Sequence, residues 1–591
     1  MSATLWGRPL SVEHFYTRVF VEALLDHPML LSRLRLLEPW GLHFHNDDLD
    51  DFSLEFQLEE SRRVRRNLEI LRSYPRAELS PSQLLSSDVL DWFLAVRADG
   101  EPYLFHDYPL NQLDGIHGEL PDFMLNVHQV NDARDAWNYV ERLSRFGVAI
   151  DQVIASVRQR AERGLTPPRF VLRRVRSDVE TFLSADPAEH VLVTGFEASL
   201  AAIVDVSARE REELTAAARE QVERTVLPAW RRLAAALPAL DEIATDEAGA
   251  WKHPDGDAYY AWTLRLHTTT QLDADAIHAI GLAEVARIHA KLREILTREG
   301  YHARDLGATL RALHAEPRFL YPDDEEGRAR ILADYTAIVA AVEPRLPEWF
   351  GRLPQAPVVV RRVPAFKEAG AAGAYYQPPP LDGSRPGIFF ANLRSVREVV
   401  RFGMRTLAHH EAIPGHHLQI ALANEQHELP LFRRVVPFTA FVEGWALYAE
   451  QLAAEQGLNP TPWDQLGWLV ADVFRAVRLV VDTGLHARRW SRERAIDYML
   501  ANTGMPETDV VAEVERYAVL PGQACAYKIG QLEILRLREH ARRELGPRFE
   551  LKHFHDVVLG NGALPLVLLE REVEGWIESE QGAAAESAPM L

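Results

Sequence analysis

The feature that most constrains how this chain can fold is an eleven-residue segment containing four histidines and one glutamate. It runs from His409 to Gln419 and reads HHEAIPGHHLQ. Neutral imidazole nitrogens are good ligands for Zn²⁺, and a glutamate directly after a ligand is placed to take a proton from water. The segment therefore predicts a zinc site in which His410 binds the metal and Glu411 is the general base.

Helix geometry shows why this segment is unusual. Two ligands on one regular helix stand four residues apart, and the residue four positions after His410 is Pro414. On an unbroken helix His416 would lie about 240° around the axis from His410, and His417 would lie about 10 Å along it. Proline removes a helical hydrogen bond and glycine accepts unusual dihedral angles, so Pro414 and Gly415 are predicted to break the helix. The break would bring His416 to the metal as the second ligand.

Two further histidines leave alternatives open. His417 is the alternative second ligand, and His409 is predicted either to support a ligand or to pack in the core. A set of hydrogen-bonded histidines that hold no metal is the remaining interpretation of the segment. The position of Glu411 directly after His410 favours the metal site.

A catalytic zinc site usually has three protein ligands, and the third candidate here is a glutamate. Glu443 lies in the segment FVEGWALYAE, 27 residues after His416, which allows one helix to end and another to follow. Glu443 and Glu450 are seven residues apart and share a helix face, so Glu450 is a candidate partner for a ligating imidazole. Gly444 permits the close approach of a neighbouring backbone.

Helical periodicity dominates the chain. Apolar residues recur at spacings of three and four, with arginine and glutamate between them. The pattern predicts helices over residues 11–37, 136–163, 198–240 and 274–297, and Asp273 is predicted to cap the last of them. The first half of the chain is therefore expected to be mostly α.

A change in composition near residue 354 predicts a small β element over residues 356–392. The β-branched run 357–363 is predicted to form one strand and residues 387–392 a second. The Pro- and Gly-rich stretch 374–386 between them is expected to be a loop. An exposed edge strand at this place could pair with an extended peptide, whereas a purely structural hairpin is the alternative.

Charge and cysteine content restrict the partners and the compartment. The formal net charge of −21 argues against a nucleic-acid partner and against docking on an anionic membrane. The single cysteine, Cys525, excludes an intrachain disulfide and fits a reducing compartment, where it is expected to be a small buried residue. No secretory signal and no long apolar window is found, so a cytoplasmic location is expected.

Five motifs occur in order through the C-terminal third of the chain. They read HHEAIPGHHLQ, FVEGWALYAE, VDTGLHARRW, RYAVLPGQACAYKIGQ and FHDVVLGNGALPLVLLE. Together they resemble the large bacterial domain-of-unknown-function family 885. That family is similar in turn to the helical gluzincin peptidases, which include angiotensin-converting enzyme, thimet oligopeptidase and carboxypeptidase Taq. The resemblance implies a mainly α, two-lobed metallopeptidase-like fold around a deep cleft, with a small β-sheet next to the active site.

Residues in and near the C-terminal motifs are further candidates for roles in catalysis and substrate binding. Related helical peptidases use a tyrosine hydroxyl to stabilise the oxyanion, and Tyr527 is the first candidate, although a buried structural tyrosine is the alternative. Lys528 and Arg516 are candidates for binding a terminal carboxylate of the substrate. His486 is four residues after Asp482, and the two are expected to place an imidazole near the reaction centre or to form a structural polar pair. Three more arginines compete for the carboxylate: Arg385, Arg475 and Arg478.

These expectations combine into one prediction. Residues 1–260 form an N-terminal helical lobe, residues 261–581 form the catalytic lobe, and residues 582–591 form a disordered tail. The protein is predicted to be a zinc-dependent hydrolase that cleaves peptide bonds, as a carboxypeptidase or an oligopeptidase. The alternatives are a dedicated amidase acting on a non-peptide or γ-glutamyl-like amide, and a metal-free binding or scaffold protein.

Overall fold

The computed structural model describes residues 7–364, 368, 373–381, 383 and 385–587. Its internal contacts divide the chain into two compact units. The first unit comprises residues 1–75 and 97–259, and the second comprises residues 76–96 and 260–591. The predicted lobe boundary at residue 260 lies beside this division. However, residues 76–96, which include most of helix α5 (Pro81–Asp99), belong to the second unit.

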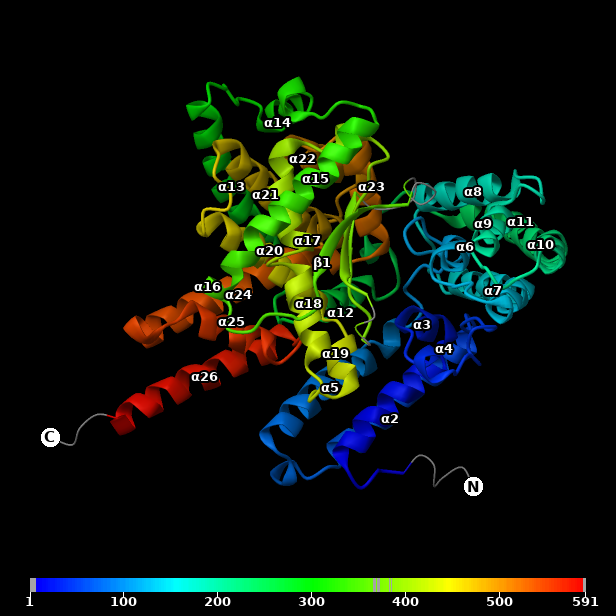
Figure 1. Ribbon diagram of the computed structural model, residues 1–591, viewed down its shortest axis with the longest axis horizontal. Coiled ribbons are helices and arrows are strands. Elements are labelled where there is room, and N and C mark those ends of the chain that lie inside the picture. Colours follow the sequence, from blue (N-terminus) through cyan, green and yellow to red (C-terminus); the bar gives the residue numbers. More distant parts are fainter. Residues whose placement is uncertain (1–6, 365–367, 369–372, 382, 384, 588–591) are drawn as a thin grey trace. The chain divides into compact units, whose positions relative to one another are not determined.

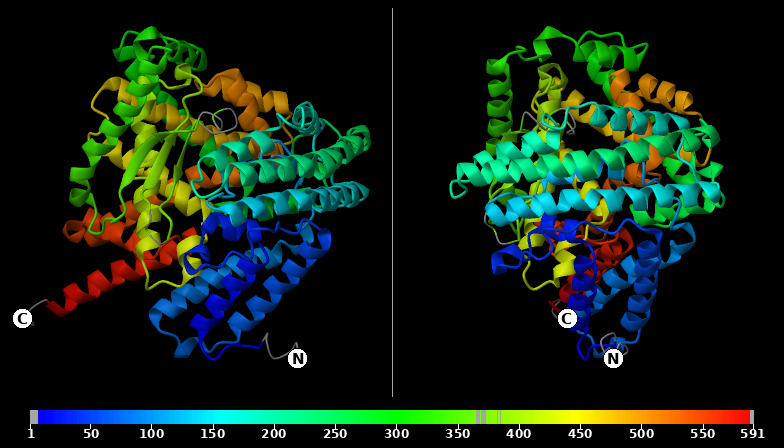
Figure 2. Two further views of the ribbon diagram at one scale, coloured as in Figure 1. Left: turned by 45° about the vertical axis from the view of Figure 1, so that its right-hand side comes forward. Right: turned by 90° about the vertical axis from the view of Figure 1, so that its right-hand side faces the viewer.

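The first unit is helical throughout its described secondary structure (Figure 1). Its helices are α2 (Val12–Leu25), α3 (Pro28–Leu34), α4 (Leu54–Arg72), α6 (Ile116–Asn126), α7 (Ala133–Glu162), α8 (Arg169–Leu183), α9 (Val191–Ala201), α10 (Ala208–Gln221) and α11 (Leu227–Ile243). Helices α7 to α11 lie side by side in both views of Figure 2 and pack on one another. Helix α12 (Gly256–Thr268) contains the boundary between the units.

Aromatic packing explains the helical periodicity of the first unit. The Trp230 ring on α11 stacks on Phe146 of α7 and on Phe182 of α8, with centroid distances of 5.7 and 4.6 Å. Trp230 is fully buried. The helix predicted over residues 11–37 is in fact two helices, because Pro28 lacks the amide hydrogen that a continuous helix requires and instead starts α3.

The second unit contains the histidine-rich segment and is also mainly α, as predicted. Besides α5, its helices are α13 (Ala274–Arg298), α14 (Leu306–His314), α15 (Glu325–Val342), α16 (Leu346–Trp349), α17 (Met404–Glu411), α18 (His416–Glu425), α19 (Leu431–Val435), α20 (Thr439–Glu455), α21 (Pro462–His486), α22 (Arg492–Asn502), α23 (Glu507–Val519), α24 (Gln523–Leu545), α25 (Leu551–Leu559) and α26 (Leu566–Ser587). The predicted cap of α13 is confirmed, since the Asp273 carboxylate accepts a hydrogen bond from the Ala276 amide.

Two glycines allow α20 and α24 to pack at very close range. A Cβ atom on Gly444 would lie 2.5 Å from the Gly530 backbone, and one on Gly530 would lie 1.8 Å from the Ala440 carbonyl oxygen. Any side chain would therefore push the two helices apart. The close approach expected at Gly444 is confirmed, and it fixes the helix that carries Glu443.

A three-stranded sheet lies within the second unit, in the order β1–β3–β2. The predicted strands are confirmed as β1 (Val358–Arg362) and β3 (Gly387–Ala391), which are parallel. The prediction of a loop over residues 374–386 is wrong at its start, where β2 (Ala374–Gln377) pairs antiparallel with β3. Tyr375 and Tyr376 favour extended backbone, and the prolines that follow end the strand rather than prevent it.

The predicted C-terminal tail is wrong at its start. Helix α26 continues to Ser587, so residues 582–587 are helical instead of disordered. Consecutive alanines in this stretch have the highest helix propensity, which explains the extension. The rest of the predicted tail, residues 588–591, lies outside the described residues. Across the part of the chain that the structure describes, no helix is long and apolar enough to cross a membrane.

Candidate metal centre

The predicted break in the histidine-rich segment is confirmed. Helix α17 ends at Glu411 and helix α18 begins at His416, with a cis peptide bond between Ile413 and Pro414. The turn is held from outside, because the Trp445 indole nitrogen of α20 donates a hydrogen bond of 2.9 Å to the Pro414 carbonyl. His410 and His416 therefore stand at the ends of two successive helices.

Gly415 is required by the tightness of this turn. A Cβ atom at this position would lie 2.0 Å from the carbonyl oxygen of His410 and 2.3 Å from that of His409. Contacts this short are sterically impossible for any other residue without movement of the backbone. The glycine thus lets the chain fold back against the end of α17, which brings His416 beside His410.

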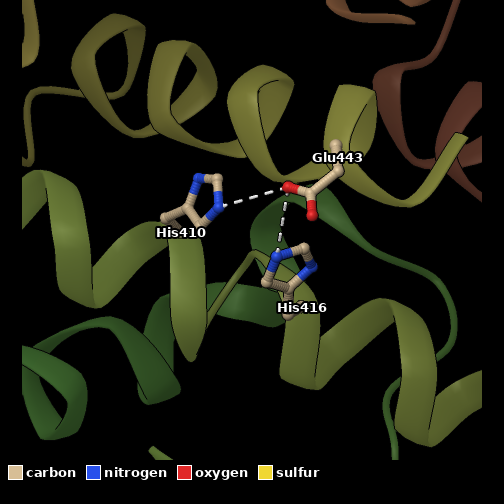
Figure 3. Close-up of side chains that lie close together, drawn as sticks. All are labelled: His410, His416 and Glu443. Carbon is tan, nitrogen blue, oxygen red and sulfur yellow. Dashed lines mark ion pairs between the residues drawn. The ribbon is translucent and has the colours of Figure 1, made fainter. Parts of the chain in front are cut away.

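Three side chains converge from α17, α18 and α20 (Figure 3). The ligand-type atoms of His410, His416 and Glu443 all lie within 4.8 Å of one another. Glu443 Oε2 is 3.6 Å from His410 Nε2 and also 3.6 Å from His416 Nε2. Ligand atoms about 2.1 Å from a tetrahedral zinc lie about 3.4 Å from one another. The two distances of 3.6 Å are close to this spacing, so the three side chains could hold a metal ion.

An unsatisfied acceptor supports this fit. Glu443 Oε2 is buried, and it has no hydrogen-bond partner among the described residues. Its distances of 3.6 Å to the two imidazoles are too long for hydrogen bonds. A buried carboxylate oxygen without a hydrogen bond is costly, and a cation among the three side chains would satisfy it.

The charges in the cluster are strongly coupled. Although burial opposes ionisation of Glu443, its interactions with His410 and His416 hold the pKa of the carboxyl well below its usual range. Burial also disfavours the charged form of His410, but the carboxylates of Glu443 and Glu450 outweigh it and raise the pKa to about 9. A metal ion that binds here would replace the proton on His410.

Glu450 orients the first histidine. Its carboxylate oxygen Oε1 lies 2.7 Å from His410 Nδ1, and the side chain is almost fully buried. This contact directs the other ring nitrogen, Nε2, towards Glu443 and His416. Glu411, the last residue of α17, follows directly in the chain and its charge contributes to the raised pKa of His410.

The other two histidines of the segment have different surroundings. His417 uses both ring nitrogens: Nδ1 is 2.9 Å from the Tyr376 hydroxyl of β2, and Nε2 is 3.0 Å from the Ala356 carbonyl. These contacts attach the segment to the sheet and favour His416 as the ligand. His409 is buried without a hydrogen-bond partner for either ring nitrogen among the described residues, and burial, helped by Arg405, lowers its pKa to about 3. It is a packing residue.

The tyrosine and arginine candidates lie together. Tyr527 is partly exposed on α24, and the Arg478 guanidinium of α21 lies 4.5 Å from the centre of its ring. Arg516 on α23 donates a hydrogen bond of 2.7 Å to the Gln523 side chain. The sequence shows Arg478 only as one of three competing arginines, because nothing in the spacing of α21 shows that it packs on Tyr527. Tyr517, near the C-terminal end of α23, is fully buried and donates a hydrogen bond to Glu513.

Two predicted substrate-binding residues are placed in internal networks instead. The Lys528 side chain is 1% exposed, and its ammonium nitrogen lies 2.5 Å from Asp472 and 3.0 Å from Glu284. His486 is fully buried, and its Nε2 lies 3.0 Å from the Tyr517 carbonyl. Burial and internal partners occupy both side chains, so we assign Lys528 and His486 to helix packing and correct their predicted role.

Asp482, the predicted partner of His486, is likewise part of the packing between helices. Its carboxylate accepts hydrogen bonds from the Tyr260 hydroxyl at 2.6 Å and from the Gly522 amide at 3.1 Å. Through Gly522 it holds the turn that precedes α24. Asp482 and His486 therefore both take part in the packing between helices, through hydrogen bonds to other residues.

Comparison with known proteins gives a family and a fold. The family described as bacterial protein of unknown function (DUF885) matches residues 37–573. The chain is 34% identical to a protein from Colwellia psychrerythraea described as a "putative lipoprotein", over 96% of this chain and 99% of that chain, with a TM-score of 0.92.

A more distant structure shares the fold. It is described as a "putative lipoprotein of unknown function" from Shewanella oneidensis, with 16% identity and a TM-score of 0.72 over 95% of this chain and 99% of that chain. No curated protein matches the sequence. The family match covers most of the chain and contains every residue of the candidate centre. The chain belongs to the DUF885 family of bacterial proteins of unknown function.

Proposed function

We propose that this protein is a zinc-dependent hydrolase that cleaves peptide or related amide bonds. The observation that supports the proposal most is the convergence of His410, His416 and Glu443, with a buried carboxylate oxygen that has no hydrogen-bond partner among the described residues. Two imidazoles and one carboxylate are a known ligand set of catalytic zinc sites. Bound Zn²⁺ would lower the pKa of a water molecule and polarise a carbonyl group.

The residues around the ligands take defined roles in this proposal. Glu411 accepts a proton from the attacking water and later donates it to the leaving amine. Glu450 keeps His410 in the orientation that presents Nε2 to the metal. The Tyr527 hydroxyl, which lies on the helix packed against α20, donates a hydrogen bond to the oxygen that gains negative charge.

The direct test is the Glu411→Gln variant. It should keep its zinc, because Glu411 is not a ligand, and it should lose hydrolysis of a mixed peptide library by roughly 10³-fold or more. Glu428→Gln is a matched control, since Glu428 is exposed in the turn after α18. Unchanged turnover in Glu411→Gln would show that Glu411 is not the general base and would contradict the proposed mechanism.

We also propose that the enzyme acts in the cytoplasm. The support is the cysteine content: Cys525 is the single cysteine and it is buried in α24 as a free thiol. A chain without disulfides fits a reducing compartment.

A further inference from the structure

A cluster of charged side chains surrounds Tyr527 and has no role in the steps described above. Arg478 comes from α21, and Glu513 and Arg516 come from α23. Both arginines pair with the same carboxylate: Glu513 Oε2 is 3.0 Å from Arg478 Nη2, and Glu513 Oε1 is 3.4 Å from Arg516 Nη1. The Arg478 guanidinium lies over the Tyr527 ring. We call these four side chains the arginine cluster.

The arginine cluster has an excess of positive charge. Two guanidinium groups share one carboxylate, so one positive charge is not balanced within it. Arg475, one helical turn before Arg478, donates a hydrogen bond to the Ala471 carbonyl and forms no ion pair with the described residues. This local excess is found in a chain whose net charge is −21. The cluster is therefore suited to bind an anion.

One donor in the cluster also lacks an acceptor. Arg478 is 5% exposed, and its Nη1 is buried without a hydrogen-bond partner among the described residues. Burial opposes its charge, but Glu513 and the neighbouring tyrosines raise its pKa, so Arg478 stays charged. A buried charged donor without an acceptor is unfavourable, and a carboxylate from outside the chain would satisfy it.

Helix packing places the cluster near the metal ligands. Tyr527 is three residues before Gly530 on α24, which is about 4.5 Å along the helix and on the same face. Gly530 touches Gly444 on α20, and Gly444 directly follows Glu443. Tyr527 is partly exposed, as are Arg516 and Glu513. A substrate held at the metal could therefore extend over Tyr527 to the two arginines.

We infer that Arg478 and Arg516 bind the free terminal carboxylate of the substrate. The substrate class is then peptides or N-acyl amino acids that carry this carboxylate close to the bond that is cleaved. Planar guanidinium groups bind carboxylates through paired hydrogen bonds, which gives direction as well as affinity. The inference rests on the proposed function and narrows it to release of C-terminal residues.

The test compares one N-acetylated peptide as its free acid and as its C-terminal amide, with zinc-loaded full-length protein. The wild type should favour the acid by on the order of 100-fold in kcat/KM. Arg516→Gln should lower kcat/KM for the acid by about the same factor and leave kcat/KM for the amide unchanged. Arg516→Lys, which keeps the positive charge, should lose less of the kcat/KM for the acid. Arg536→Gln is the control, because Arg536 likewise forms ion pairs with glutamates but lies outside the arginine cluster.

Two outcomes of the cleavage assays overturn the inference. One is equal cleavage of acid and amide by the wild type, and the other is an unchanged preference in Arg516→Gln with normal zinc content. Calorimetric binding of both peptides to zinc-loaded Glu411→Gln protein separates this inference from the proposed function. If the protein binds the acid more tightly than the amide but the wild type hydrolyses neither peptide, the proposed hydrolase activity is refuted and the carboxylate site is supported. Equal binding together with Glu411-dependent hydrolysis would refute only the carboxylate site.

Discussion

At the scale of single residues, the hydrogen bond between Glu450 and His410 should control metal affinity. The carboxylate fixes the imidazole ring and increases the basicity of Nε2. Glu450→Gln should therefore weaken zinc binding by about 10- to 100-fold, measured by competition with a chelator. Glu455→Gln is a suitable control, since Glu455 lies on the same helix and pairs with Arg538. Equal zinc affinities of the wild type and Glu450→Gln would show that this hydrogen bond does not affect metal binding.

The candidate site was predictable where a residue's chemistry shows in its local sequence. The adjacency of His410 and Glu411, and the impossibility of a regular helix through Pro414, point to two candidate ligands, His410 and His416, without any tertiary information. The prediction of Glu443 as the third candidate ligand required only the assumption that a second helix follows His416. The role of Lys528 was not predictable, because the Asp472 and Glu284 carboxylates that bury it come from other helices.

At the scale of elements, the contact of α20 with α24 positions Glu443. Gly530→Ala would place a Cβ atom 1.8 Å from the Ala440 carbonyl, on the helix that carries this ligand. We expect a loss of about 2 kcal/mol or more in the free energy of unfolding, together with weaker zinc binding. Thermal denaturation and zinc titration measure the two effects.

A matched glycine provides the control for that prediction. Gly575 lies within α26, and no atom is within 4 Å of the place where its Cβ would be. Gly575→Ala should be neutral or stabilising by about 0.5–1 kcal/mol, because alanine is the better helix former. Similar behaviour of the two variants would contradict the close approach of α20 and α24.

Elements with their own periodicity and caps were predictable, and those defined by partners were not. The periodicity and Asp273 cap of α13 are local signals, and the structure bears them out. Strand β2 was not predicted, because its four residues lie among prolines and glycines. These residues form a strand through their pairing with β3. The division of the helix predicted over residues 11–37 depends on Pro28, whose effect on a helix can be read locally.

At the scale of the whole molecule, buried histidines should make the fold sensitive to acid. Burial lowers the pKa of His409 and His555 to about 3 and that of His417 and His486 to about 4, from an ordinary value of 6.5. Below pH 6.5 the unfolded chain binds more protons at these positions than the folded chain does. Stability should therefore fall as the pH decreases from 6.5 towards 4, by about 1.4 kcal/mol per pH unit for each histidine.

The variant His409→Phe tests this pH dependence. The ring of His409 has no hydrogen-bond partner among the described residues, so the substitution removes a titrating group and no hydrogen bond. Denaturation midpoints measured in urea at several pH values should fall less steeply for this variant than for the wild type. An equal slope would mean that His409 is not buried as a neutral ring.

The central claim is that His410, His416 and Glu443 bind zinc, and the zinc content of purified protein tests it most directly. Elemental analysis should find one zinc per chain in the wild type and in His417→Ala, whose imidazole bonds Tyr376 and the Ala356 carbonyl instead. His416→Ala should have lost its zinc while keeping its helical circular dichroism spectrum. Zinc retained in His416→Ala and lost in His417→Ala, or no zinc in a folded wild type supplied with the metal, would contradict the account.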